Sequence, residues 1–286
     1  MNMNIFKQAA VLLKDNLMVM QPLFIWALVT MLVAMPLSAK RGMDIGFIFS
    51  LSIVVLCFIA FLAGWYNCIK ATVANKFKVY ETPEERNKAQ IDILKNFFPG
   101  VGEYILPVGL AVILYGGISY GIFVLYKYLA IQAFVGAKIP NELIKLMGTG
   151  TQEQITKLVQ TLTPEQLGTL SGIMLGGFVV YFLFEILILW FAPTIFYTTK
   201  NPVIALFKAI AFTFKNFFAS IAIVVVMCLI NMLISFTNVL LGNNFLAIIP
   251  MLLSFMYIVY YVLTVFLYYE QTQNNSVIGS QLDRQV

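Results

Sequence analysis

Long apolar runs separated by short polar segments dominate the pattern of this chain. Six runs carry almost no charge, at about residues 17–37, 45–66, 101–125, 172–190, 217–241 and 245–268. A helix of about 20 apolar residues spans the roughly 30 Å hydrocarbon core of a bilayer. Helices also satisfy their backbone polar groups internally, which lipid requires. The pattern therefore predicts an all-α fold, a polytopic membrane bundle of six transmembrane helices in three hairpins.

Each predicted hairpin is preceded by two lysines that lie seven residues apart and are soon followed by Asn. The pairs are Lys7 and Lys14, Lys88 and Lys95, and Lys208 and Lys215. Positions seven apart on a helix differ by only about 20° in direction, so both lysines of a pair point the same way. Each pair therefore predicts an interfacial amphipathic helix that turns its cations toward lipid headgroups.

The four letters KNFF occur at residues 95–98 and again at 215–218. We expect Lys to end the surface helix, Asn to cap the next helix, and the two Phe to enter the aromatic belt of the membrane interface. The dipeptides Thr82-Pro83 and Asn201-Pro202 are typical helix starts. Residues 203–214 are apolar nearly all round, so this third segment also fits burial against the bundle.

The spacing of the lysine pairs predicts one membrane domain, 1–286, built from repeat units at about 4–75, 82–192 and 201–270. The second unit is longer, which places an external helical insertion at about 126–171. Within it, Thr151 and Thr163-Pro164 are expected to start short amphipathic helices, which fit either surface filling or a lid over the bundle. The polar residues at about 271–286 predict a disordered C-terminal tail.

Composition supports a membrane class and argues against catalysis. Hydrophobic residues make up 60% of the chain, charged residues 11%, and the mean hydropathy is +0.88. The chain has no histidine, and no nucleotide-binding or nucleophile motif is found. We therefore expect a protein that is not an enzyme and that uses no cofactor and no metal. Cys57, Cys68 and Cys228 are interpreted as small buried apolar thiols.

The distribution of Lys and Arg predicts the orientation of the spans. Twelve of the 18 cations fall on the side of both termini and six on the other side. Because cytoplasmic loops carry the excess of cations, both termini are predicted to be cytoplasmic. The first apolar run is too long for a signal peptide and is expected to be retained. These features indicate a multi-pass protein of a cytoplasmic membrane that binds no nucleic acid.

Glu185 is the only charged residue well inside a predicted span. A carboxylate there is costly, so it is either a functional group or a neutral acid that is hydrogen-bonded to a polar neighbour. Asn231 and Tyr115 are the expected neighbours. Two further polar residues near the cytoplasmic ends of spans, Glu103 and Asn67, are expected to line the same region.

Two G-x-x-x-G motifs occur near the predicted outer ends of the third and fourth spans. Their glycines are Gly117 and Gly121, and Gly172 and Gly176. Small residues at this spacing let helices approach closely, so the motifs predict packing of these two spans, with a dimer contact as the alternative. Pro107 and Gly109 in the third span also predict a kink.

The segment APTIFYTTKNPVIALFKAIAFTFKNFF, residues 192–218, resembles a bacterial group of six-helix integral membrane proteins. The group comprises the YciC-like proteins and the membrane domain attached to some glycerophosphodiester phosphodiesterases. The matching residues are Pro193, Ala205, Leu206, Lys208, Asn216 and Phe217. The chain departs from the pattern at Ala209, Ile210 and Ala211. The resemblance implies a fold more than a function.

Three functions remain open from the sequence. The first is a non-enzymatic protein that engages anionic phospholipid for membrane organisation or lipid handling, through the lysine pairs. The second is a transporter or permease of a small or lipidic substrate, with Glu185 as its coupling acid. The third is an accessory or scaffold subunit with a membrane-protein partner, and a homo-oligomer is also open.

Overall fold

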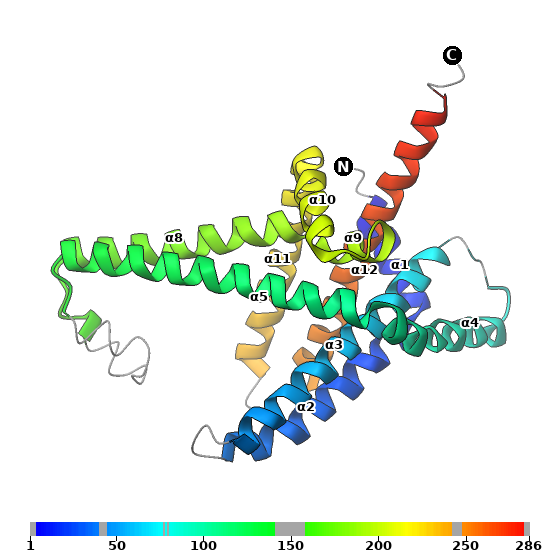
Figure 1. Cartoon of the computed structure of the whole chain (residues 1–286), viewed down its shortest axis with the longest axis horizontal. Helices are drawn as coiled ribbons and strands as arrows, with labels where there is room; N and C mark the ends of the chain where they lie inside the picture. The colour runs from blue at the N-terminus through cyan, green and yellow to red at the C-terminus, as the bar shows by residue number, and fades with distance from the viewer. Residues whose placement is uncertain are drawn as a thin grey trace. The chain divides into compact units, whose positions relative to one another are not determined.

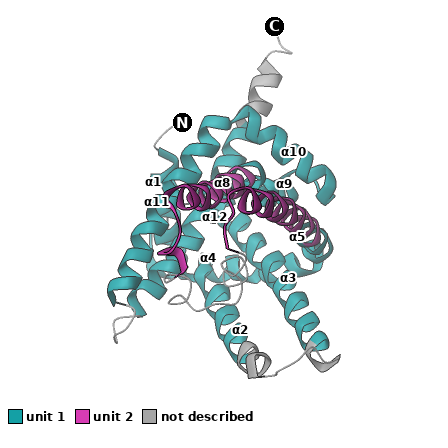
Figure 2. Cartoon of the chain, turned by 90° about the vertical axis from the view of Figure 1, so that its left-hand side faces the viewer, with its two compact units in different colours: residues 1–112, 186–286 teal, residues 113–185 magenta. Residues whose placement is uncertain are grey.

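The computed structural model describes residues 4–39, 45–76, 78, 80–140, 158–241 and 248–282. Every regular element in these residues is a helix, and they contain no strand. The helices fall into two compact units, coloured separately in Figure 2. Unit 1 contains residues 1–112 and 186–286, and unit 2 contains residues 113–185. Helices α5 and α8 each have residues in both units.

Unit 1 holds most of the helices (Figure 1). They are α1 (Asn4–Asp15), η1 (Leu17–Met20), α2 (Gln21–Ala39), α3 (Ile45–Ala74), α4 (Pro83–Lys95), the first part of α5 (Phe97–Gly136), the end of α8 (Pro164–Ile188), α9 (Phe191–Tyr197), α10 (Pro202–Lys215), α11 (Phe217–Leu241) and α12 (Ile248–Leu282). Within it, α2 packs beside α3 and α11 beside α12, while α1 packs against α12 and α10 against α9.

Among the described residues, five helical stretches are long and apolar enough to cross a membrane. They are Ile48–Ala74, Pro83–Gly136, Pro164–Tyr197, Phe217–Leu241 and Ile248–Asn274. A sixth is obtained if α1 and Leu17–Leu32, which meet at an angle of 86°, are counted together. The chain is therefore all-helical and has the helices of a multi-pass membrane protein.

The core of unit 1 lies where the end of α3, the start of α11 and the middle of α12 meet η1, α9 and α10. Its largest fully buried side chains include Trp190, Tyr269, Phe266 and Ile69. The opposite ends of α2, α3, α11 and α12 expose large apolar side chains instead. A water-soluble protein rarely exposes so large an apolar surface, so lipid is the expected cover. Cys57 and Cys228 belong to this exposed surface, and only Cys68 is buried as expected.

Three helix starts follow the predicted local chemistry. The Thr82 hydroxyl accepts a hydrogen bond from the backbone N–H of Glu85 at 3.2 Å, and Asn201 Oδ1 accepts from the N–H groups of Val203 and Ile204. Thr163 and Gln166 form a reciprocal capping box at the start of α8. Pro at the first helical position follows each of these caps.

Several boundaries differ from those predicted. Helix α5 continues to Gly136 and α8 begins at Pro164, so much of the predicted insertion at 126–171 consists of the ends of two long helices. The helix expected at Thr151 lies outside the described residues. Helix α12 continues to Leu282 through most of the predicted tail. Gln271 donates to Gln8 Oε1 at 2.7 Å, which ties the start of that segment to α1.

In unit 2, the second part of α5 runs beside α8 (Figure 1). Tyr126 lies against Gly176 and Gly177, and its hydroxyl donates to the backbone carbonyl of Ile173. Near the end of α5, a small core forms from Phe134, Ile139, Leu162 and Leu170. The described residues that adjoin the end of α5 and the start of α8 therefore have a small hydrophobic core of their own.

Candidate functional site

The asparagine after each lysine pair makes the same hydrogen bond. Its side-chain amide donates to the carbonyl four residues earlier, from Asn16 to Leu12 at 2.9 Å, from Asn96 to Asp92 at 2.9 Å and from Asn216 to Phe212 at 3.1 Å. The backbone carbonyl of each asparagine accepts from the first turn of the following helix. Each asparagine therefore caps the helix before it, and the prediction that its side chain caps the next helix is wrong.

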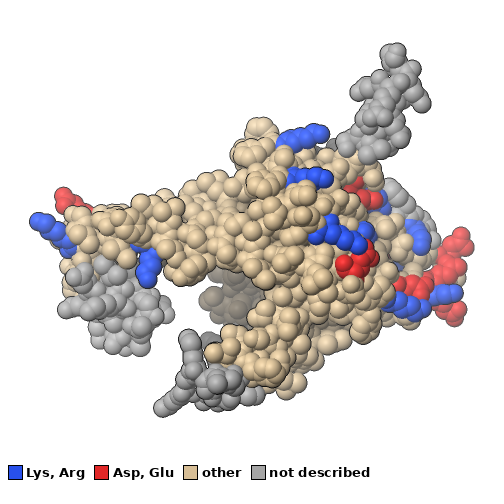
Figure 3. Space-filling view, viewed as in Figure 1, with Lys and Arg blue, Asp and Glu red and all other residues tan. Residues whose placement is uncertain are grey.

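The six paired lysines are all exposed on α1, α4 and α10. Lys95 forms an ion pair with Asp92 at 2.7 Å, while the other five form none with any described residue. Figure 3 shows Lys and Arg over α10, whereas around α4 it shows Lys and Arg mixed with Asp and Glu. Exposed and unpaired, these five cations are free to meet an anion from outside the chain.

The apolar faces of the three lysine helices differ. In α1, the apolar face is covered by the protein itself, because Ile5, Ala9, Leu12 and Leu13 are buried and α1 packs on α12. In α4, Ile93 and Gln90 are buried against η1 and α3. A helix whose apolar face is already covered has little left to insert into lipid, so α1 and α4 differ from the predicted interfacial helices.

Helix α10 has one covered face and one exposed apolar face. Ala205, Ala209, Phe212 and Thr213 are buried. The exposed face carries Val203, Ile204, Phe207 and Phe214, with Phe207 68% and Phe214 67% exposed. At the start of α11, Phe218 is 86% exposed and extends this row. An exposed row of large apolar residues beside lysines is the pattern of a helix at a membrane surface.

A cleft of about 360 Å³ lies where α10 meets the end of α12. Lys208 and Lys215 both line it. Lys208 lies about one turn before Ala211 on α10, and Lys215 lies about one turn after it. The lining also includes Phe212, Tyr269, Thr272, Gln273 and Thr198. None of the lining residues is acidic, so two cations and several hydrogen-bonding groups converge without a carboxylate to neutralise them. This is the chemistry of an anion site.

The floor of the α10 cleft is held by aromatic packing. Phe212 and Tyr269 lie 4.6 Å apart between ring centroids, and Trp190 contacts both. The Thr198 hydroxyl and the Tyr269 hydroxyl are hydrogen-bonded at 2.7 Å. The cleft is therefore built on rigid residues, while the two lysine side chains at its edge are free to adjust.

The four predicted intramembrane polar residues have different surroundings. Tyr115 donates to Glu185 Oε1 at 3.2 Å, whereas Glu103 pairs with Lys200 at 2.9 Å. Asn67 donates to the carbonyl of Asn96 at 2.9 Å. Asn231 is exposed on α11 and its side chain bonds to no described residue. Glu185, Glu103 and Asn67 thus each bond to a different partner. Of the two expected neighbours of Glu185, Tyr115 bonds to it and Asn231 does not.

Replacing Glu185 by Gln is expected to change stability by less than about 1 kcal/mol, because the amide oxygen can still accept from Tyr115. Replacing it by Leu removes the acceptor and is expected to cost about 0.5–1.5 kcal/mol, the usual net contribution of one hydrogen bond to stability. Thermal unfolding of both variants in detergent checks this difference. Equal losses for Gln and Leu would show that the bond to Tyr115 is not what Glu185 contributes.

The glycines of the two motifs are not equivalent. A Cβ at Gly176 would lie 3.1 Å from the Tyr126 hydroxyl, and Gly177, outside the motif, is equally close to that ring. A Cβ at Gly117, Gly121 or Gly172 would meet no described atom within 4 Å. Of the four motif glycines, only Gly176 therefore packs closely on a described residue, and it does so together with Gly177 against Tyr126.

A cation inside a span was missed by the sequence interpretation, which ended the second span before Lys70. Lys70 lies in α3, donates to the Tyr104 hydroxyl at 3.1 Å and sits 5.6 Å from the centroids of both Tyr104 and Tyr197. Lys200 stacks on the Tyr104 ring at 5.3 Å. This cluster joins α3, α5 and α9 by cation–π contacts. Its only sequence signal was Lys70 four residues after Tyr66, one turn beyond an apolar run.

No protein-family model matches this chain, and neither a curated protein nor a solved structure shows a significant similarity to it.

Proposed function

We propose that this chain is a non-enzymatic integral membrane protein that holds an anionic lipid headgroup in the α10 cleft, in the service of membrane organisation or lipid handling. The observation that carries the proposal is the pairing of Lys208 and Lys215 in a cleft without an acidic residue. The lipid phosphate would lie between the two ammonium groups. The Thr198 and Tyr269 hydroxyls are bonded to each other, so one of them keeps a proton that it can donate to the phosphate.

The exposed apolar row of α10 supports a lipid rather than a soluble anion. Phe207 and Phe214 project on the face that the protein leaves uncovered. Burying a Phe side chain in the membrane contributes about 1.5–3 kcal/mol. The acyl chains of a bound lipid would thus lie along a surface that favours hydrocarbon, while its headgroup meets the lysines. A soluble anion would contact only the lysines and would leave the apolar surface uncovered.

The proposal includes the finer features that the sequence predicts. These are three helical hairpins, cytoplasmic termini and a bacterial cytoplasmic membrane, in line with the resemblance to the YciC-like group. The position of the α10 cleft beside the end of α12 would then place the headgroup site on the cytoplasmic side. Lys88, which is exposed on α4 and forms no ion pair with a described residue, would add a further cation.

The combined change of Lys208 and Lys215 to Gln is expected to remove the extra stability that anionic lipid gives the protein. Each lysine near an anionic surface contributes about 1 kcal/mol, so the pair contributes about 2 kcal/mol, or about 30-fold in affinity. The measurement is thermal unfolding in nanodiscs of phosphatidylglycerol and of phosphatidylcholine. We expect wild type to unfold at a higher Tm in the anionic lipid, and the variant to lose about 4 °C of that difference.

Lys127 and Lys138 provide a matched control, because changing both to Gln removes the same charge from unit 2. This control is expected to keep the full difference in Tm between the two lipids. An equal loss in the control would mean that net charge, and not the α10 cleft, recognises the lipid. A variant at Lys208 and Lys215 that kept the full difference would rule the cleft out.

A further inference from the structure

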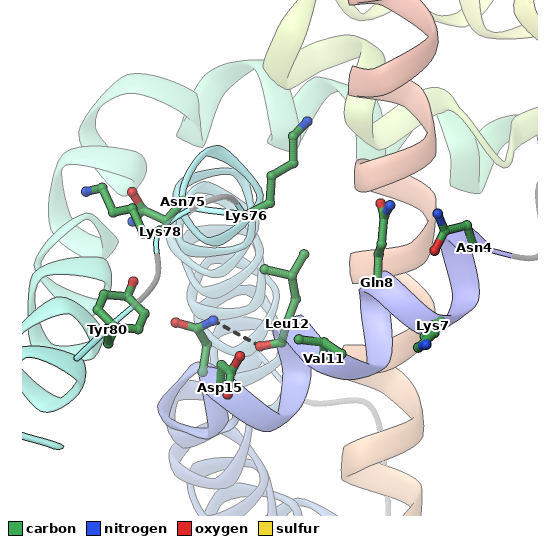
Figure 4. A pocket seen from close by; sticks show the side chains of 11 residues that line it. Asn4, Lys7, Gln8, Val11, Leu12, Asp15, Asn75, Lys76, Lys78 and Tyr80 are labelled. Atoms are coloured by element: carbon green, nitrogen blue, oxygen red, sulfur yellow. Dashed lines mark hydrogen bonds between the residues drawn. The ribbon is translucent and has the colours of Figure 1, made fainter. Parts of the chain in front are cut away.

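A second cleft, of about 280 Å³, lies between α1 and the segment that follows α3 (Figure 4). Figure 4 shows Lys7 and Gln8 of α1 on one side, and Lys78 and Tyr80 on the other. It shares no lining residue with the α10 cleft. It is therefore a different site from the lipid site proposed above.

Two buried polar atoms at this cleft have no partner among the described residues. Asn16 is only 3% exposed, and its amide nitrogen donates to Leu12, but its Oδ1 accepts no hydrogen bond. The Tyr80 hydroxyl is also buried and unbonded. A buried polar atom without a partner costs about 1–3 kcal/mol, so native proteins rarely leave one unfilled. Two such atoms at one cleft indicate that a polar molecule supplies the missing bonds.

The equivalent asparagine at α10 shows how the same atom is satisfied when no ligand is needed. There, Asn216 Oδ1 accepts a hydrogen bond from the Tyr268 hydroxyl at 3.2 Å. Beside α1 an asparagine and a tyrosine again line one cleft, but Asn16 Oδ1 and the Tyr80 hydroxyl do not bond to each other. The asparagine and tyrosine are hydrogen-bonded to each other beside α10 but not beside α1, as expected if a ligand group enters between Asn16 and Tyr80.

The charges around the cleft favour an anion. The Lys76 ammonium is engaged by Glu270, and the Asp15 carboxylate by Arg86. Lys7 and Lys78 form no ion pair with any described residue, so the remaining charge at the cleft is positive. Burial, with a smaller contribution from Asp15, raises the pKa of Tyr80, so this side chain stays a neutral hydroxyl that can donate and accept.

We propose that this cleft binds a phosphorylated polyol, whose hydroxyl bridges Asn16 Oδ1 and the Tyr80 hydroxyl and whose phosphate meets the ammonium group of Lys78, which lies on the same side of the cleft as Tyr80 (Figure 4). A ligand hydroxyl fits these two atoms because it donates to the amide oxygen and still bonds to the phenol. The same chemistry is presented by the headgroup of a polyol phospholipid and by a free polyol phosphate. The volume is sufficient for a group of this size.

Tyr80→Phe is the most informative variant, because it removes one oxygen atom and nothing else. The Tyr80 hydroxyl has no partner among the described residues, so its loss is expected to leave the Tm without ligand unchanged or slightly higher. Lys78→Gln removes one cation of the cleft. Lys14→Gln is the matched control, because Lys14 lies on α1 but is not among the residues that line the cleft.

The first arm measures binding of free sn-glycerol 3-phosphate and of inorganic phosphate to the purified full chain by calorimetry. We expect glycerol 3-phosphate to bind wild type about tenfold more tightly than phosphate, the effect of one good hydrogen bond. Tyr80→Phe is expected to lose that tenfold preference and to bind both probes like phosphate. Lys78→Gln is expected to weaken both probes by about tenfold, and Lys14→Gln to change neither.

The second arm compares phosphatidylglycerol with phosphatidic acid, which lacks the polyol headgroup, by native mass spectrometry. If wild type prefers phosphatidylglycerol and Tyr80→Phe does not, the ligand is the headgroup of a phospholipid. If only the calorimetry shows a preference for the polyol phosphate, the ligand is a free molecule. Equal binding of polyol and plain phosphate by wild type, or an unchanged preference in Tyr80→Phe, would overturn the proposal and leave an ordered water as the partner of both atoms. Failure of the α10 lysine variants would not affect either arm.

Discussion

Replacing Trp190 by Ala is expected to lower the free energy of unfolding by about 4 kcal/mol, the usual cost of removing a fully buried Trp side chain. Trp190 is fully buried and is the N-cap residue of α9. Its ring lies 5.1 Å from that of Phe212 and 5.2 Å from that of Tyr268. Its indole N–H donates to the Ser220 hydroxyl at 2.9 Å. One side chain thus joins α9, α10, α11 and α12, and no neighbouring residue can fill its place.

The control for Trp190 is the change to Phe, which keeps an aromatic ring and removes the indole N–H. The Ser220 hydroxyl still donates to the carbonyl of Asn216 at 3.0 Å, so it is not left without a partner. We therefore expect Trp190→Phe to cost less than half as much as Trp190→Ala. Unfolding of both variants in detergent measures the difference. A loss below about 1 kcal/mol for the Ala variant would contradict the assignment of Trp190 to the core.

Replacing Gly100 by Ala is expected to destabilise the protein by about 2 kcal/mol, as extra atoms do in a well-packed contact. A Cβ at Gly100 would lie 2.4 Å from the Cβ of Asn67 and 3.0 Å from the carbonyl oxygen of Ala63. These atoms belong to α3 near its backbone, so they cannot simply rotate away. The shift would also strain the hydrogen bond from Asn67 to Asn96, which holds α3 against the start of α5.

Gly102 is the matched control for this change, because it lies in the same helix and a Cβ there would meet nothing within 4 Å. Ala is a better helix former than Gly by about 1 kcal/mol. Gly102→Ala is therefore expected to raise the Tm, while Gly100→Ala lowers it. The two changes add the same methyl group, so only the packing of α3 on α5 distinguishes them. Shifts of the same sign would show that this contact is not formed as described.

The helix starts could be predicted from the sequence because their chemistry is local. Thr82, Thr163 and Asn201 each precede Pro and form their caps with residues no more than three positions away. The apolar runs likewise identify the spans, since the length of a membrane helix is set by the bilayer. No partner from elsewhere in the chain is needed for either inference.

The candidate sites depend on partners that are distant in the chain and could not be predicted in the same way. The lysine spacing marked Lys208 and Lys215, but not Thr272 and Thr198, which complete the α10 cleft from other elements. Lys70 was placed in a loop because charge normally ends a span, whereas the rings of Tyr104 and Tyr197 stabilise it inside α3. Such contacts are set by packing between helices rather than by local sequence.

The sequence indicated that the repeated asparagine caps a helix, but not which of the two adjoining helices it caps. Asn is suited to both ends of a helix, and the pattern K-N before an apolar run pointed to the helix that follows. In all three copies the side-chain amide instead donates to the carbonyl four residues earlier, in the helix that ends at the asparagine. Asn216 serves a second purpose, since its Oδ1 accepts from Tyr268 of α12.

Native mass spectrometry of the protein, extracted gently with its own lipids, tests the central claim most directly. We expect wild type and the control at Lys127 and Lys138 to retain an anionic phospholipid through activation, and the variant at Lys208 and Lys215 to lose it while keeping its fold. If the variant retains the same lipid in the same amount as wild type, the α10 cleft does not hold the headgroup and the proposed function is wrong.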